Sequence, residues 1–248
     1  MEYFFHTVET IPQGLGFGAF SLTHILWLTA LVAVCIVCGL LYRKASADGR
    51  IWVRKGLAIA LIVDELFKQI PLLIFGRWTP DYLPLHLCSI NIFLIAWHAF
   101  KGGATIGGFL YTVCIPGALA AMLFPTWTSL PAWNFMTLHS FSVHIMLIAY
   151  PVLLTIGGDI RPNWRHVLKY MGVLAILALL AYIINLLLNT NFFFLIKADI
   201  GNPLYWFEQN WGSHLLGFPV IIAGVLLIMQ GPLALIEWKK QKANNQKQ

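Results

Sequence analysis

Charge is what this chain has least of. Asp, Glu, Lys and Arg make up 10% of its 248 residues, whereas soluble domains carry about 25%. Hydrophobic residues make up 59% of the chain, and the mean hydropathy is +0.75. A soluble protein of this size could not bury so much apolar surface, so lipid must be its solvent. The composition indicates an integral membrane protein.

Several features that would mark other classes of protein are also missing. No nucleotide-binding glycine motif occurs, and the amino terminus has Glu2 and Glu9 in place of the basic region of a cleavable signal peptide. The net charge of +6 comes from basic residues in short loops and near the C-terminus, which is a membrane-topology signal and argues against nucleic-acid binding. We expect no cofactor and no metal. A disulfide framework is not expected either, because apolar runs contain all four cysteines, Cys35, Cys38, Cys88 and Cys114.

Long apolar runs are abundant instead. Spanning about 30 Å of hydrocarbon takes roughly 20 helical residues, and the runs are too long and too uniformly apolar for barrel strands. The sequence therefore predicts an all-α, polytopic membrane protein in which residues 1–248 form a single transmembrane domain. Seven helices are expected, at about 20–43, 52–75, 82–100, 104–124, 134–156, 164–188 and 213–237.

The basic residues orient these helices. Thirteen of the sixteen Lys and Arg residues fall in the connections after the first, third and fifth helices and beyond the seventh. Only Arg77 and Lys197 fall on the other side, and Lys68 lies inside a helix. Because basic loops stay in the cytoplasm, we expect the N-terminus outside and the C-terminus inside. The expected location is the plasma membrane, as a multi-pass protein of the bacterial cytoplasmic membrane.

Polar residues that are unusual in a membrane helix gather toward the outer ends of five of these segments. Ionisable groups inside a membrane usually face a bundle interior or a water-filled cavity. We therefore predict a polar cavity that opens toward the outer side. Its expected members are Glu65, Lys68, His86, Cys88, Asn91, His139, His144, Asn185, Asn189 and His214.

One short segment, "LPLHLCSIN" at residues 83–91, indicates a candidate catalytic site with a cysteine nucleophile. A cysteine nucleophile needs a nearby base that lowers its pKa or accepts its proton. His86 is two residues from Cys88, which is about 200° around a regular helix, so His139 at nearly the same depth is the expected partner. His144, five residues further in, is the second choice, and the alternative is that Cys88 is a small buried residue.

The other candidates also have structural alternatives. Glu65 and Lys68, three residues apart, are either a tether for their helix or a functional pair in which Glu65 orients a histidine and Lys68 meets a lipid phosphate. Asn185 and Asn189 are either hydrogen-bonding links between helices or donors to a developing oxyanion.

The chain also resembles the YwaF-like family of bacterial integral membrane proteins. The resemblance is carried by "DELFKQIPLLIFGRWTPDYLPLHLCSIN", "LHS" around His139, "IRPNWR" at 160–165 and "INLLLNTNFFFL" at 184–195. An animal relative of that family looks like a phospholipid acyltransferase that uses a cysteine and a histidine. The resemblance implies these roles for Cys88 and His139, although Ser140 stands where the family usually has glycine. Other family positions are matched by Glu65, His86, Asn185 and Asn191.

Three functions are therefore considered. The first is a membrane-embedded acyltransferase that moves a fatty acyl chain between phospholipid and lyso-lipid through Cys88 and His139, with membrane phospholipids or lysophospholipids as partners. The second is a metal-dependent lipid hydrolase whose ligands come from the histidines and Glu65. The third is a non-enzymatic transporter or lipid-binding membrane protein.

Overall fold

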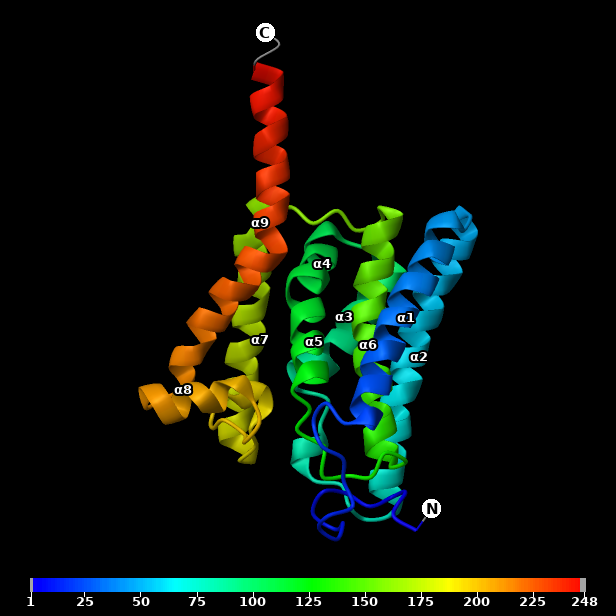
Figure 1. Cartoon of the computed structure of the whole chain (residues 1–248), viewed down its shortest axis with the longest axis vertical. Helices are drawn as coiled ribbons and strands as arrows, with labels where there is room; N and C mark the ends of the chain where they lie inside the picture. Colours follow the sequence, from blue (N-terminus) through cyan, green and yellow to red (C-terminus); the bar gives the residue numbers. More distant parts are fainter. Residues whose placement is uncertain (1, 246–248) are drawn as a thin grey trace.

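A computed structural model describes residues 2–245, except for the side chains of Lys240, Ala243 and Asn245. No strand occurs in that part of the chain, which confirms the all-α prediction. The helices run up and down between two ends of the molecule (Figure 1). We call these the N-terminal end, near residue 2, and the C-terminal end, where α9 projects. Lys247, one of the thirteen basic residues assigned to the inner side, lies outside the described residues.

Five helices are long: α1 (Leu22–Lys44), α2 (Ala47–Ile74), α6 (Phe135–Gly157), α7 (Val167–Leu188) and α9 (Gly217–Asn245). Four are shorter: α3 (Leu87–Lys101), α4 (Ala104–Phe109), α5 (Ile115–Leu123) and α8 (Pro203–Trp211). Single turns complete the fold: η1 (Pro80–Tyr82), the π-helical turn η2 (Leu110–Cys114), η3 (Trp164–His166), η4 (Phe192–Phe194) and η5 (His214–Leu216). Together, α4, η2 and α5 make one rod, and η2 widens it just before Pro116.

Five segments of the described chain are long and apolar enough to cross a membrane: Leu22–Lys44, Ala104–Leu123, Phe135–Gly157, Trp164–Leu188 and His214–Lys239. These segments make the chain a multi-pass membrane protein. The other two expected spans differ from them in charge or length. The middle of α2 carries Asp64, Glu65 and Lys68, and α3 has only 15 residues.

The third helix was predicted to begin at residue 82, and this was wrong. Residues 83–86 are not helical, and α3 begins at Leu87. Pro84 explains the difference, because a proline disfavours the helical conformation of the residue before it, and Leu83 has φ −55° and ψ 142°. The second helix begins five residues earlier than predicted, at Ala47, where the Ser46 side chain accepts a hydrogen bond from Gly49 N. The long connection before the last helix contains α8, which was not predicted.

The centre of the bundle is α6, the most buried of the apolar helices, which packs against α1, α2, α3 and α5. Beside this bundle stand α7, α8 and α9 (Figure 1). They are joined to it where α4 approaches α7, since a Cβ at Gly108 would come within 2.2 Å of the Tyr170 ring and only glycine fits there. A buried hydrogen bond from Gln230 Nε2 of α9 to Thr112 Oγ1 of η2, 2.6 Å long, adds a polar link.

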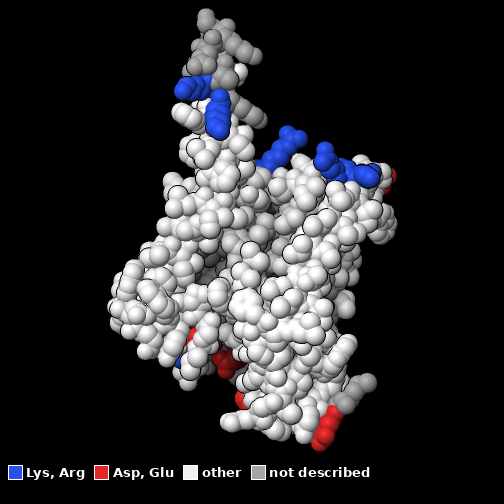
Figure 2. Space-filling view, in the orientation of Figure 1, with Lys and Arg blue, Asp and Glu red and all other residues white. Residues whose placement is uncertain are grey.

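The two ends differ in charge. On the face shown in Figure 2, most of the Lys and Arg side chains gather at the C-terminal end, whereas most of the visible Asp and Glu side chains lie toward the N-terminal end. The turns at the C-terminal end connect α1 to α2, α3 to α4 and α6 to η3, which are the connections that the sequence analysis found to be basic.

Candidate functional site

His139 is held against α2 by Asp64. It lies in the second turn of α6, its side chain is buried, and its Nδ1 is 2.8 Å from Asp64 Oδ2 and 3.1 Å from the Asp64 carbonyl oxygen. The other carboxylate oxygen of Asp64 accepts a hydrogen bond from Ser142 Oγ, one turn further along α6, at 2.7 Å. The hydrogen bond to the Asp64 carbonyl, with the carboxylate beside it, fixes the ring orientation and leaves Nε2 as the nitrogen that accepts a proton. Oδ2 of Asp64 makes no hydrogen bond within the described part of the chain.

The sequence analysis did not select Asp64. Its signal was a second carboxylate directly beside Glu65 in an apolar segment. The two carboxylates leave the helix about 100° apart, and in the structure each lies nearest a different nitrogen of the His139 ring. Glu65 Oε2 is 3.9 Å from His139 Nε2.

Glu65 forms the ion pair that was expected with Lys68. Both side chains are buried, and Oε1 of Glu65 is 2.6 Å from Nζ of Lys68. Gln69 adds a hydrogen bond to the same oxygen at 2.8 Å and another to the carbonyl oxygen of Tyr82 at 2.6 Å. The other carboxylate oxygen, Oε2, is buried and has no hydrogen-bond partner in the described part of the chain. One side of Glu65 is therefore fixed, and the side nearer to His139 is open.

Cys88 is the second residue of α3 and is half-buried against the main apolar core. Asn91 and Ile95, three and seven residues further along, are buried on the same side of the helix, and α3 packs against both α2 and α6. Cys88 and His139 are therefore on the inward faces of neighbouring helices near the N-terminal end. Among residues 2–245 no hydrogen bond joins Cys88 Sγ to the His139 ring.

The other predicted histidines contact aromatic or acidic neighbours. His86 lies edge-on to Phe192 with ring centroids 5.1 Å apart. His144 stacks on Trp127 with ring centroids 5.4 Å apart. His214 Nδ1 is 3.6 Å from Glu208. Within the described residues, no group of three or more His, Cys, Asp or Glu side chains is arranged to hold a metal ion.

The asparagines of "INLLLNTNFFFL" hold the chain that follows α7. Oδ1 of Asn185 accepts hydrogen bonds from Phe192 N and Thr190 Oγ1 at 2.7 and 3.0 Å, and Nδ2 donates to the Phe192 carbonyl at 3.0 Å. Asn191 binds the backbone of residues 196 and 197 in the same way. Asn189 takes no part in these contacts, because α7 ends at Leu188 and Asn189 is exposed with a left-handed φ of 54°.

The N-terminal segment lies over this end of the bundle. Nδ2 of Asn134 donates to the carbonyl oxygens of Tyr3 and His6 at 2.9 and 2.8 Å, and Tyr82 donates to Glu9 at 3.2 Å. Burial, reinforced by the Glu9 carboxylate, raises the pKa of Tyr82 and keeps its hydroxyl a donor. These contacts tie the segment to the start of α6 and to η1.

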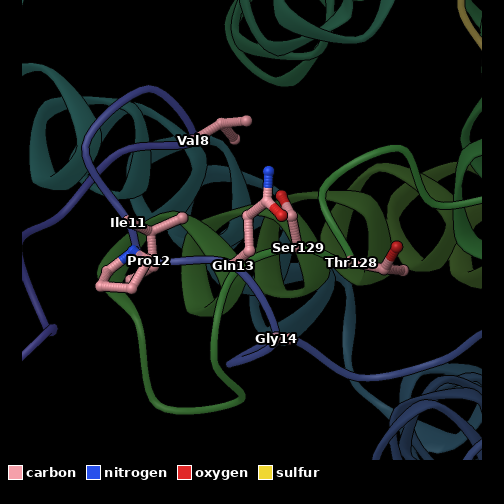
Figure 3. A pocket seen from close by; sticks show the side chains of 8 residues that line it. Val8, Ile11, Pro12, Gln13, Gly14, Thr128 and Ser129 are labelled. Atoms are coloured by element: carbon pink, nitrogen blue, oxygen red, sulfur yellow. The ribbon is translucent and has the colours of Figure 1, made fainter.

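A cavity lies beside this segment. Figure 3 shows side chains that line it, which come from residues 8–14 and from Thr128 and Ser129. Its volume is about 510 Å³. A second cavity of about 310 Å³ lies at the C-terminal end, between residues 161–164 and α9. Neither of these two cavities includes Cys88, Glu65 or His139.

A comparison with protein families places this arrangement in a known group. The model of the TMEM164 family matches residues 19–230, which include Asp64, Glu65, Cys88 and His139. The chain belongs to the TMEM164 family. No curated protein and no solved structure matches it significantly. Membership in the TMEM164 family agrees with a multi-pass helical membrane protein, and the function has to be argued from the site.

Proposed function

We propose that this protein is a membrane-embedded acyltransferase in which Cys88 is the nucleophile and His139 is the base. The observation that carries the proposal is the Asp64–His139 pair, with 2.8 Å between Oδ2 and Nδ1. A nucleophilic site needs a base that is itself oriented by a third group. Asp64 supplies this orientation, and the inward face of α3 brings a thiol to the same end of the bundle.

The proposed topology has seven spans, with the N-terminal end outside the plasma membrane. The gathering of Lys and Arg at the C-terminal end supports this orientation (Figure 2). The charges of α2 are compatible with a membrane position because Glu65 and Lys68 pair with each other and Asp64 contacts His139. Non-helical backbone at membrane depth is tolerated where protein buries it, and residues 83–86 pack between helices in this way. Leu83 and Leu85 contact the cluster of Ala181, Phe192 and Phe193.

The proposed reaction has two half-reactions. The thiol proton of Cys88 moves to Nε2 of His139, and the sulfur attacks the carbonyl carbon of a phospholipid ester. The ester C–O bond breaks, the departing lyso-lipid takes the proton from His139, and the acyl chain stays on Cys88 as a thioester. A second lyso-lipid then gives its hydroxyl proton to His139 and attacks the thioester. The thiolate leaves and regains the proton.

The carboxylates around His139 suit this cycle. The imidazole becomes positively charged in each half-reaction, and Asp64 at Nδ1 and Glu65 near Nε2 both stabilise that charge. Lys68 balances the second carboxylate, so Glu65 does not need to take up a proton in the apolar bundle. Catalytic hydrogen bonds are often long without substrate, and we expect Cys88 and His139 to make contact when an ester occupies the site.

A lipid substrate is supported by position and by resemblance. The site lies within helices that lipid surrounds, so an ester carbonyl near the head group reaches it by lateral entry. The YwaF-like motifs, whose animal relative looks like a phospholipid acyltransferase, lie in the family-matched region and contain both Cys88 and His139.

The test is acyl transfer by purified protein in lipid nanodiscs that contain labelled phospholipid and unlabelled lyso-lipid. We expect Cys88→Ala to abolish transfer, and Cys114→Ala to retain it as a matched control, since Cys114 donates to the Leu147 carbonyl and packs in the core. Hydroxylamine should release the acyl chain from wild type but not from Cys88→Ala, because thioesters react with it. Undiminished transfer by Cys88→Ala would refute the proposal.

A second candidate is a lipid-binding protein without catalysis. It is favoured by the absence of a hydrogen bond between Cys88 and His139 in the described residues. Wild-type protein that binds phospholipid stoichiometrically but never forms labelled product or an acyl-cysteine would support this candidate.

A further inference from the structure

The amino end of α3 has backbone donors without acceptors. The first main-chain hydrogen bond into the helix is Ile90 N to the His86 carbonyl, at 2.9 Å. His86, which precedes the helix, makes no side-chain cap. The amides of Leu87, Cys88 and Ser89 therefore have no acceptor in the described part of the chain. Water satisfies such donors in a soluble protein, but it is scarce in the apolar part of a bilayer.

A second observation points to a ligand at the same place. Asn91 is 1% exposed, and its Oδ1 is buried without a hydrogen-bond partner among residues 2–245. Helix side chains lean toward the amino end and lie over the residue three or four positions earlier. By this preference, the Asn91 amide group belongs on the side of the turn that contains Leu87 and Cys88. A buried polar group left without a partner destabilises the fold, so its retention in the core calls for a function.

We propose that the amino end of α3 and the Asn91 side chain form the subsite that binds the ester carbonyl group during acyl transfer. When the electron pair of the sulfur forms the C–S bond, the π pair of the C=O bond moves onto oxygen and makes it negative. That oxygen sits beside the nucleophile, where the amides of Cys88 and its neighbours donate hydrogen bonds to it. The Nδ2 group of Asn91 is the further donor, since Oδ1 can only accept a hydrogen bond. When the pair returns to the C=O bond, the lyso-lipid oxygen leaves with the proton from His139.

The electrostatics of the helix support the same assignment. The amino end of an α-helix carries partial positive charge that stabilises anions. At α3 this charge acts on the thiolate of Cys88 first and on the carbonyl oxygen next. The sequence analysis had assigned the oxyanion to Asn185 or Asn189. Asn185, however, uses its amide group to hold Thr190 and Phe192, and Asn189 is exposed.

This inference rests on the proposed acyltransferase function, and its first test compares two buried asparagines. Asn91→Leu should raise the thermal unfolding temperature, because it removes an unpartnered polar group, and should lower acyl transfer about 10²-fold. Asn185→Leu should lower the unfolding temperature, because it breaks three hydrogen bonds. If Asn91→Leu destabilises the protein, or leaves transfer at the wild-type rate, Asn91 is not part of the subsite.

The second test removes one backbone donor. Proline is accepted at the first position of a helix, and His86 already has the extended conformation that a following proline requires, with φ −65° and ψ 154°. Leu87→Pro should transfer acyl chains about 10²-fold more slowly than Leu87→Ala, which loses the same side chain but keeps the N–H. Alkylation of Cys88 by iodoacetamide, which forms no oxyanion, should differ much less between the two variants.

The outcomes separate this inference from the function on which it rests. If Cys88→Ala transfers acyl chains as well as wild type, the acyltransferase proposal falls. If Cys88→Ala is inactive while Leu87→Pro equals Leu87→Ala and Asn91→Leu equals wild type, Cys88 is the nucleophile and the amino end of α3 is not the oxyanion site.

Discussion

Two groups of polar residues lie at opposite ends of the bundle, and they differ in how completely they are hydrogen-bonded. At the C-terminal end, Tyr42 donates to Asp159 at 2.8 Å, Arg50 donates to the Gly157 carbonyl at 2.7 Å, and His98 pairs with Tyr150 at 2.9 Å. Each of these side chains links two helices or a helix and a loop. At the N-terminal end, the site around His139 has buried atoms without hydrogen-bond partners in the described residues, on Asp64, Glu65, Asn91 and Thr137.

The difference separates a structural role from a functional one. Buried polar groups in folded proteins are nearly always paired, and a fully paired network makes the fold rigid and specific. Unpaired groups gathered at one end indicate a place where a ligand completes the hydrogen bonds. The C-terminal group is not entirely satisfied, since Nε of the neighbouring Arg54 also lacks a partner among residues 2–245, but the pairs named above form its connections between elements.

The largest effect is expected when one aspartate from each group is replaced and the two variants are compared. Asp64→Asn should lower acyl transfer about 10³-fold, because an amide cannot balance the imidazolium and can hold the wrong tautomer of His139. Asp159→Asn should leave the transfer rate per folded molecule unchanged while lowering the unfolding temperature. Transfer rates in nanodiscs, normalised to the folded fraction, measure both. Equal losses of activity in the two variants would erase the distinction between the groups.

Breaking the ion pair at the site should have the next largest effect. Lys68→Met leaves the buried Glu65 carboxylate without its partner and should lower the free energy of unfolding by about 3 kcal/mol. Adding Glu65→Gln should recover most of that loss, because no charge then stays unpaired. Urea or thermal unfolding of the single and double variants measures the effect. If the double variant is less stable than Lys68→Met alone, the pair is not an isolated unit.

Loss of the Asn185 hydrogen bonds to the segment after α7 should have a smaller effect. Asn185→Ala removes three hydrogen bonds to residues 190 and 192 and should lower the free energy of unfolding by about 2 kcal/mol. Amide hydrogen exchange of residues 190–195 should become faster. Asn189→Gly is the control, because the exposed position has a left-handed φ that glycine adopts freely. Exchange that is unchanged in Asn185→Ala would mean that other contacts hold this segment.

The smallest effect is expected from one hydrogen bond of the C-terminal group. Tyr150→Phe removes the bond to His98 and should lower the free energy of unfolding by about 1 kcal/mol, with no change in transfer rate. A marked loss of transfer, measured in the same nanodisc assay, would connect the C-terminal group to the chemistry and contradict its structural assignment.

Hydropathy predicted most of the helices closely. The expected spans 104–124, 134–156 and 164–188 agree with Ala104–Leu123, Phe135–Gly157 and Trp164–Leu188 to within one residue at each end. Such agreement arises because a long apolar run has one stable state in lipid. Boundaries set by local backbone chemistry were predicted less well, as at Leu87 after Pro84 and at α8 within an aromatic-rich connection.

The site was only partly visible in the sequence. His139, Glu65 and Lys68 were selected because charge is rare in an apolar run, and the Glu65–Lys68 pair follows from a spacing of three residues. Asp64 was overlooked because its role depends on α6, 75 residues away. Nothing in the sequence indicates that the Tyr150 hydroxyl lies 2.9 Å from the His98 ring.

Composition by itself determined that this chain is embedded in lipid as a bundle of helices. The solvation of apolar surface depends on residue type and not on which residues pack against one another. The tertiary structure decided which polar groups satisfy one another and which stay open. A hydrogen bond forms only between atoms about 3 Å apart, and that separation, across α2, α3 and α6, is fixed by packing between segments that are distant in the chain.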